Sequence, residues 1–101
     1  MQQSTSDQNL VGKYYFNTKS TAAWKFLTHE GDKVTCVLVR TASRWYERHK
    51  DHYQPGVTIQ EYDYNKLKNH RYVDPNWIIV DDLKAALILY GTNEPMVEVD
   101  A

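Results

Sequence analysis

The sequence predicts a small α+β domain with a mainly antiparallel sheet of about five strands and two short helices. Three observations support this fold class. The chain has 101 residues, which is the usual size of one domain. Strand-like segments do not alternate regularly with helical ones, as a parallel β-α-β fold would require. Two strand-like runs within residues 22–40 flank a polar loop with a glycine, the pattern of a β-hairpin. Whether the sheet is flat, curled or barrel-like stays open.

The domain organisation is simple. Residues 1–9 are polar and contain no aliphatic residue after Met1, so we expect a disordered N-terminal arm. Residues 10–101 are expected to form one globular domain. Hydrophobic residues make up 42% and charged residues 25% of the chain, which is enough apolar surface to exclude an intrinsically disordered protein.

The first half of the domain is expected to hold three strands. The segment from Leu10 to Phe16 is strand-like, and Gly12 marks a possible bulge site. In the hairpin, the polar loop spans residues 29–33. The run Val34–Val39 is apolar on both faces, so the second hairpin strand should be central, with Cys36 and Leu38 buried.

The segment "TASRWYERHKDHYQPG" predicts the first helix, with Thr41 or Ser43 as its N-cap. At helical spacing one face is aromatic, and Trp45 is expected to point into the core. The residues on that face are Trp45, Tyr46, His49, His52 and Tyr53.

The next segment is strand-like, but its apolar alternation changes parity at residues 60–61. Val57 and Ile59 fall on one face and Tyr62 and Tyr64 on the other, which predicts either a bulge or two exposed rings. Residues 65–72 are basic and are expected to form a turn or a short edge strand.

The last third predicts a strand, a helix and an edge strand. A proline turn precedes the β-like run that ends at residue 80. Asp81 or Asp82 can cap the following helix, and Gly91 marks its end. The helix has apolar residues at spacings of three and four, namely Leu83, Ala86, Leu87 and Tyr90. Residues 96–100 add the edge strand.

Charge is divided along the chain although the net charge is only −1. Residues 33–71 carry an excess of four positive charges, and residues 72–101 an excess of five negative charges. The two segments either bind different partners or neutralise each other in the fold.

No motif points to catalysis, so we expect a non-enzymatic protein without cofactor. Cys36 lies within an apolar strand, where a thiol is inert. The pair Asp81 and Asp82 opens a helix, a position that stabilises acids. His49 and His52 are three residues apart and leave a metal-binding or enzymatic alternative open, but no zinc signature accompanies them.

A second alternative is a protein that binds single-stranded nucleic acid. Cations and aromatic rings alternate through the middle of the chain, and such a surface can hold phosphates and stack bases. The residues concerned are Arg40, Arg44, Arg48, Lys50, Lys66, Lys68, Arg71, Trp45, Tyr46, Tyr62, Tyr64 and Tyr72. A pI of about 6.4 argues against a dedicated nucleic-acid binder.

The leading hypothesis is a protein-binding module, acting as a monomer or homodimer. Tyrosine, tryptophan and arginine are the residues that anchor protein interfaces. Small chains of this kind are common among phage and mobile-element accessory proteins that bind and inhibit a larger host factor. The candidate binding residues are Arg44, Tyr46, Arg48, His49, Lys50, His52, Tyr53, Tyr62 and Tyr64.

The expected location is the cytoplasm. The single cysteine permits no intramolecular disulfide, which favours a reducing compartment. The N-terminal segment lacks the apolar region of a signal peptide, and no apolar run has the roughly 20 residues of a membrane span, so no membrane partner is expected.

Overall fold

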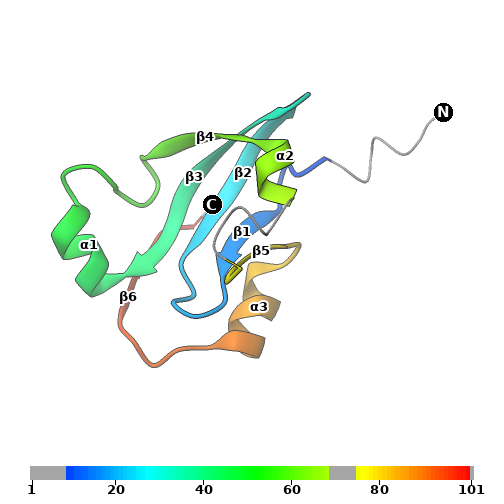
Figure 1. Cartoon of the computed structure of the whole chain (residues 1–101). Helices are drawn as coiled ribbons and strands as arrows, with labels where there is room; N and C mark the ends of the chain where they lie inside the picture. The colour runs from blue at the N-terminus through cyan, green and yellow to red at the C-terminus, as the bar shows by residue number, and fades with distance from the viewer. Residues whose placement is uncertain (1–8, 69–74, 101) are drawn as a thin grey trace.

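The secondary structure confirms an α+β fold built on one antiparallel sheet. The computed structural model describes residues 9–68 and 75–100, and within them the sheet has six strands and is open rather than closed into a barrel. The elements are, in chain order, β1 (Tyr14–Asn17), β2 (Ala23–Glu30), β3 (Lys33–Ala42), α1 (Ser43–His49), β4 (Ile59–Asp63), α2 (Tyr64–Lys68), β5 (Trp77–Val80), α3 (Leu83–Tyr90) and β6 (Met96–Glu98) (Figure 1). The six strands agree with the strand-like segments of the sequence, whereas α2 is a third helix that the sequence pattern did not indicate.

Strand β3 is the centre of the sheet, as its apolar composition predicted. The strand order is β4-β3-β2-β1-β5, and β6 also pairs with β3. The first half of β3 pairs with β4, from Lys33 opposite Asp63 onward, and its last residues pair with β6, where Arg40 lies opposite Glu98. Strands pair with β3 along both edges, and apolar clusters on the two faces of the sheet bury most of its side chains, so that Cys36 is fully buried.

The predicted hairpin is formed by β2 and β3. Glu30 pairs with Lys33, so the connecting loop is only Gly31 and Asp32, shorter than the five-residue loop expected. Gly31 has a φ of +61°, a conformation that an L-residue with a side chain rarely adopts. A glycine at the first central position suits a tight two-residue hairpin.

Helix α3 covers one face of the sheet, and its predicted N-cap and C-cap are confirmed. The carboxylate of Asp82 accepts hydrogen bonds from the backbone N–H groups of Lys84 and Ala85, and Gly91 is the C-cap. Ala86 is buried against the sheet. The surrounding cluster consists of Phe16, Ala23 and Val39, with Tyr14, Val37, Ile78, Val80, Leu83 and Leu87 at its edge.

The opposite face of the sheet carries the larger apolar cluster. Its buried members are Leu10, Tyr15, Trp24, Phe26, Val34, Cys36, Leu38 and Leu67. Helix α2 contributes Leu67 and covers one end of this face, while α1 lies at the other end (Figure 1). The middle of the face therefore has no helix packed on it in the described part of the chain, and aromatic side chains cover it instead.

The first predicted helix is shorter than expected. Its N-cap is Ala42, which makes no side-chain capping bond, rather than Thr41 or Ser43. The helix ends at His49, so His52 and Tyr53 belong to the turn that follows and not to the helix. The prediction that Trp45 points into the core is also wrong, because 38% of this side chain is exposed.

The parity change in the fourth strand has a different explanation from the two predicted. The register between β3 and β4 is continuous and contains no bulge. The aliphatic side chains of Val57 and Ile59 are the exposed ones, at 67% and 59%, whereas the ring of Tyr62 faces the apolar cluster. Tyr64 begins helix α2, which replaces the predicted turn or edge strand as far as residue 68. Residues 69–72 and the arm 1–8 lie outside the described residues.

Candidate functional site: an aromatic cavity on the uncovered sheet face

A cavity of about 620 Å³ lies on the sheet face opposite α3, between α1 and α2. This volume is within the range of pockets that take a small molecule or a few residues of a peptide, roughly 300–1,000 Å³. Six aromatic rings form most of its wall, those of Tyr15, Trp24, Trp45, Tyr53, Tyr62 and Trp77. All three tryptophans of the chain are among them.

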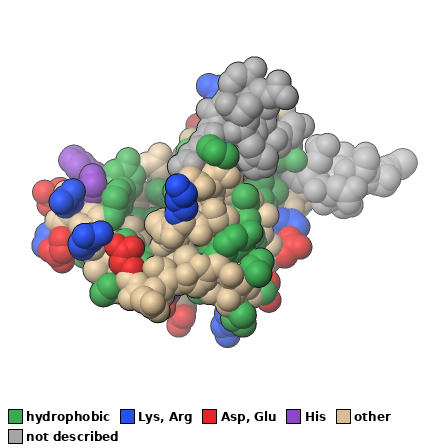
Figure 2. Space-filling view, turned by 60° about the horizontal axis from the view of Figure 1, so that its bottom comes forward, with side chains coloured by type: hydrophobic (Ala, Val, Ile, Leu, Met, Phe, Trp, Pro, Cys, Tyr) green, Lys and Arg blue, Asp and Glu red, His purple; other side chains and the backbone are tan. Residues whose placement is uncertain are grey.

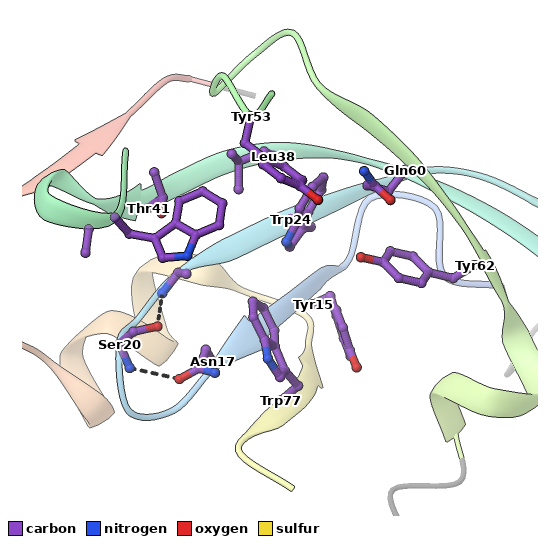
Figure 3. A pocket seen from close by; sticks show the side chains of 13 residues that line it. Tyr15, Asn17, Ser20, Trp24, Leu38, Thr41, Tyr53, Gln60, Tyr62 and Trp77 are labelled. Carbon is purple, nitrogen blue, oxygen red and sulfur yellow. Dashed lines mark hydrogen bonds between the residues drawn. The ribbon is translucent and has the colours of Figure 1, made fainter. Parts of the chain in front are cut away.

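The antiparallel register brings these rings to one face. Tyr15 on β1 lies opposite Trp24 on β2, and Trp24 lies opposite Leu38 on β3. Residues directly opposite each other in a ladder point to the same side of the sheet. Tyr62 on β4 and Trp77 on β5 reach the same side from the two outer strands (Figure 3). The wall of the cavity is therefore assembled from five separate strands.

The rings hold each other in place. Tyr15 and Trp77 are stacked, with ring centroids 4.9 Å apart. The ring of Trp24 meets those of Tyr53 and Tyr62 edge-on, at 6.4 Å and 6.5 Å. Stacked and edge-to-face pairs at these separations are favourable arrangements. The contacts define the ring positions before any ligand binds (Figure 3).

Helix α1 supplies the rim. His49 stacks on Trp45 with ring centroids 4.2 Å apart, and Trp45 also contacts Tyr53 at 5.2 Å. The Nδ1 atom of His49 lies 2.9 Å from the backbone carbonyl oxygen of Trp45. Because a carbonyl oxygen only accepts, Nδ1 is the protonated nitrogen of this bond. The hydrogen bond orients the ring of His49, and this ring then stacks on the indole of Trp45 at the rim of the cavity.

The cavity wall is uncharged. No Asp, Glu, Lys, Arg or His is among the described residues that line it. Its polar members are Asn17, Ser20, Thr41 and Gln60. Burial, and to a lesser degree the neighbouring Cys36, Tyr15 and Tyr53, raises the pKa of Tyr62 well above 10.0, so its hydroxyl keeps its proton. The site can therefore pack flat apolar groups and donate hydrogen bonds, but it offers no counter-charge.

One corner of the cavity is fixed by a tight turn. The side-chain oxygen of Asn17 accepts hydrogen bonds from the backbone N–H groups of Lys19 and Ser20, at 2.9 Å and 2.8 Å. The hydroxyl of Ser20 in turn accepts from the backbone N–H of Ala22 at 3.3 Å. Thr21 sits between them with a φ of +62°, a conformation rare for a β-branched residue. These bonds hold the β1–β2 connection against the cavity.

The sequence-predicted binding residues are divided by the fold. Tyr53 and Tyr62 line the cavity, and His49 supports its rim. The other residues of the first helical segment stand outside the cavity wall, on α1, its C-cap or the turn beyond, namely Arg44, Tyr46, Arg48, Lys50 and His52. Tyr64 starts α2, where its ring contacts His29 at a centroid distance of 4.5 Å.

Sequence reasoning missed three wall residues, Tyr15, Trp24 and Trp77, and assigned Trp45 to the core. The available signal was the placement of all three tryptophans in or beside strand-like segments. It was not decisive, since buried core strands have the same composition. Which rings face one cavity depends on the pairing of strands distant in the sequence.

Charges outside the cavity are mixed. Arg44 pairs with Glu94 at 3.4 Å, and Lys50 pairs with Glu47 at 3.2 Å. Arg40 pairs with Glu98 of β6. Figure 2 shows basic, acidic and histidine side chains intermixed at the end of the molecule where α1 lies. The basic middle of the sequence is thus partly neutralised by the acidic C-terminal segment, one of the two alternatives that the charge pattern left open.

The remaining reactive groups form no second site in the described ranges. No group of three or more His, Cys, Asp or Glu side chains within residues 9–68 and 75–100 is arranged to hold a metal ion. The thiol of Cys36 is buried beneath the cavity face, and burial raises its pKa to about 12. A thiol with such a pKa is not a nucleophile at neutral pH.

Fold and site together define a small α+β domain with an aromatic cavity on a sheet face whose middle carries no helix among the described residues. No protein-family model, curated protein or solved structure matches this chain. Among the helices of the described segments, none has the length and apolar character needed to cross a membrane.

Proposed function

We propose that this protein is a non-enzymatic binding module that holds an uncharged segment of a partner protein in the aromatic cavity. The observation that carries this proposal is the convergence of six aromatic rings around an uncharged space of about 620 Å³. Desolvated aromatic side chains supply most of the binding free energy at protein interfaces. The contacts among the rings reduce the ordering cost of binding, because the wall needs little rearrangement.

The chemistry of the wall supports binding rather than catalysis. Among the described residues that line it, the ionisable side chains are all tyrosines, and the raised pKa of Tyr62 removes that hydroxyl as a base near neutral pH. Cys36 lies in the same strand as Leu38 but is not part of the wall. Neither a nucleophile paired with a base nor a pair of carboxylates faces the cavity in the described part of the chain.

The size of the domain favours an accessory role. A small domain with six aromatic rings around one cavity suits a protein that binds and inhibits a larger host factor, as small phage and mobile-element proteins do. We place this activity in the cytoplasm, since one buried cysteine without a disulfide partner fits a reducing compartment. The protein would act as a monomer or homodimer.

Binding of single-stranded nucleic acid is the second candidate. The observation that favours it is Arg48, which makes no ion pair with any described residue and stands beside the Trp45–His49 stripe of α1. A base in the cavity and a phosphate on Arg48 would use both features. The salt bridges of Arg40, Arg44 and Lys50 weaken this candidate, because they offset part of the positive charge that phosphates would meet.

A variant-controlled pull-down tests the proposed function. Tagged wild-type protein should retain one dominant partner after nuclease treatment, and Trp45→Ala should lose it. Ile88→Ala is the matched control, because Ile88 is 86% exposed on α3, on the other side of the sheet. The partner should then be purified and its affinity measured by calorimetry. A partner that is released by nuclease, or that Trp45→Ala retains in full, would contradict a protein-binding cavity.

A further inference from the structure

Three hydrogen-bond donors on residues that line the cavity have no acceptor partner in the described part of the chain. The indole N–H groups of Trp24, Trp45 and Trp77 make no hydrogen bond with any described residue. An indole N–H is a donor and never an acceptor. The indole nitrogens of Trp24 and Trp77 keep some contact with solvent, and Trp45 is partly exposed at the rim. All three donors are therefore available to a ligand in the cavity.

Further polar groups of the wall add to this capacity. The hydroxyls of Tyr53 and Tyr62 and the side-chain amide of Gln60 also lack partners among the described residues. Each of these groups can donate, and the raised pKa of Tyr62 keeps its hydroxyl protonated. The one side-chain carbonyl of the corner, that of Asn17, already accepts two backbone N–H groups. The three indole N–H groups cannot accept, so unpaired donors outnumber unpaired acceptors on the wall, where Gln60 also offers a carbonyl oxygen and Tyr53 and Tyr62 offer hydroxyl oxygens.

A complementary ligand must be rich in acceptors, poor in donors, uncharged and flat-sided. A proline-rich segment in the polyproline II conformation has these four properties. Its carbonyl groups point outward and make no internal hydrogen bonds, and proline has no backbone N–H. Pyrrolidine rings pack on aromatic side chains, and the conformation is already formed in the free chain, which lowers the entropy cost.

We propose that the aromatic cavity binds a proline-rich segment of the partner protein in the polyproline II conformation. This inference rests on the proposed function and names the chemistry of the partner. One turn of such a helix is three residues and about 9 Å long. A cavity of about 620 Å³ suits a segment of that size. The tryptophan N–H groups would donate to its carbonyls while the rings pack on its prolines.

The charged side chains of α1 indicate which residues should stand next to the prolines of the ligand. The helical repeat places Glu47 opposite the stripe formed by Trp45 and His49, and it places Arg48 beside that stripe. Arg44 lies one turn before Arg48, and its side chain is 88% exposed with only a 3.4 Å contact to Glu94. Arg48 is therefore the cation nearest the edge of the cavity at α1, so we expect acidic residues next to the prolines of the ligand.

Intrinsic fluorescence is a specific probe, because every tryptophan of the chain lines the cavity. The ligand to titrate is an octaproline peptide with two aspartates at one end. We expect a saturable change in tryptophan emission and shifts of all three indole N–H signals in nitrogen-edited NMR. The matched peptide, with alanine in place of each proline, should bind at least about tenfold more weakly, as the prolines supply the preformed conformation.

Three variants separate the ring contacts from the hydrogen bonds. Trp45→Ala should weaken octaproline binding by at least about tenfold, as expected for an aromatic anchor. Trp45→Phe keeps a ring and removes the N–H, so its loss should be smaller, about three- to tenfold. Tyr53→Phe removes only a hydroxyl and serves if Trp45→Ala does not fold, with a similar expected loss. Ile88→Ala should bind like the wild type.

Several outcomes would overturn the proline-rich ligand. One is equal affinity for the proline and alanine peptides, and another is wild-type affinity in both Trp45→Ala and Tyr53→Phe. A third is tighter binding of an oligothymidine strand than of octaproline, which would favour nucleic acid. If octaproline does not bind while Trp45→Ala still abolishes the protein partner, the ligand assignment falls and the proposed function stands. If Trp45→Ala retains the protein partner, the proposed function itself falls.

Discussion

Trp45 illustrates how a single residue can be misjudged from its sequence context. A tryptophan on an apolar helical stripe normally packs into the core. Here the helix is only seven residues long and stands at the edge of the sheet, so its stripe meets the cavity mouth instead. His49 then stacks on the exposed face of the indole ring and replaces part of the missing core contact.

At Cys36 we predict low reactivity in the folded protein. Its thiol is fully buried and has a pKa of about 12 against a normal value of 9.0, so almost no thiolate exists near pH 8. A chromogenic disulfide reagent should label no thiol in native protein and one thiol per chain in urea. Rapid stoichiometric labelling of native protein would show that the β3 core is open.

The same shift predicts a loss of stability in alkali. Because the folded state raises the pKa of the Cys36 thiol, its contribution is fully present below about pH 9 and is lost as the pH rises from 9 to about 12. The pKa of Tyr62 is shifted in the same direction. The free energy of unfolding, measured by urea titration at several pH values, should fall across this window. A constant value across it would contradict the burial of both groups.

Leu38 should not tolerate a charge. It is 2% exposed, lies opposite Trp24 and forms part of the cavity floor. Leu38→Asp would place an unpaired carboxylate in an uncharged environment, at a cost of about 3 kcal/mol or more. We expect this variant to be unfolded or strongly destabilised by circular dichroism, whereas Leu38→Met should cost less than about 1.5 kcal/mol. A soluble Leu38→Asp variant with an unchanged Tm would contradict the hairpin packing.

At the level of elements, the two best-predicted segments are those with local signals at both ends. The hairpin has an apolar strand on each side and a glycine at the turn position that needs positive φ. Helix α3 has an N-cap aspartate and a C-cap glycine. Helix α1 has neither a capping side chain nor an acidic first turn, and correspondingly its length was overestimated.

The role of Asp82 as the N-cap of α3 can be tested by comparison with the adjacent Asp81. Asp82→Ala removes an acceptor from two backbone N–H groups and should lower the free energy of unfolding by about 1 kcal/mol. Asp81→Ala is the matched control, since Asp81 makes only a surface ion pair with Lys13, and such pairs contribute little. Urea denaturation of the three proteins gives the comparison. Equal losses in both variants would argue against Asp82 as the cap.

At the scale of the molecule, the fold joins the two oppositely charged parts of the chain. β6 pairs with the end of β3, and this pairing brings Glu98 to Arg40, while the preceding segment brings Glu94 to Arg44. These two ion pairs offset part of the excess positive charge of the middle segment, which weakens its attraction for a polyanion. This arrangement is the main physical reason to rank a protein partner above nucleic acid.

We accordingly predict weak binding of single-stranded DNA. Oligothymidine should bind more weakly than micromolar near physiological salt, with the Kd measured by fluorescence anisotropy. The variant Glu94→Gln frees Arg44, whose side chain is 88% exposed, so it should bind more tightly and with a steeper salt dependence, by up to about one unit of slope. Micromolar or tighter binding by the wild type would reverse the ranking of the two functions.

The sequence by itself determined the α+β class, the central hairpin, the capped helix α3 and the buried state of Cys36 and Leu38. These features depend on local signals, namely apolar runs, caps and turn residues within a few positions of each other. Only the tertiary structure decided the cavity. Its rings come from four strands, from α1 and from the segment after it, and strand pairing between distant segments sets which of them face each other. A single aromatic residue in a strand has the same local signal whether it lies in a sealed core or on a cavity wall, because the difference depends on what the opposite side of the sheet packs against.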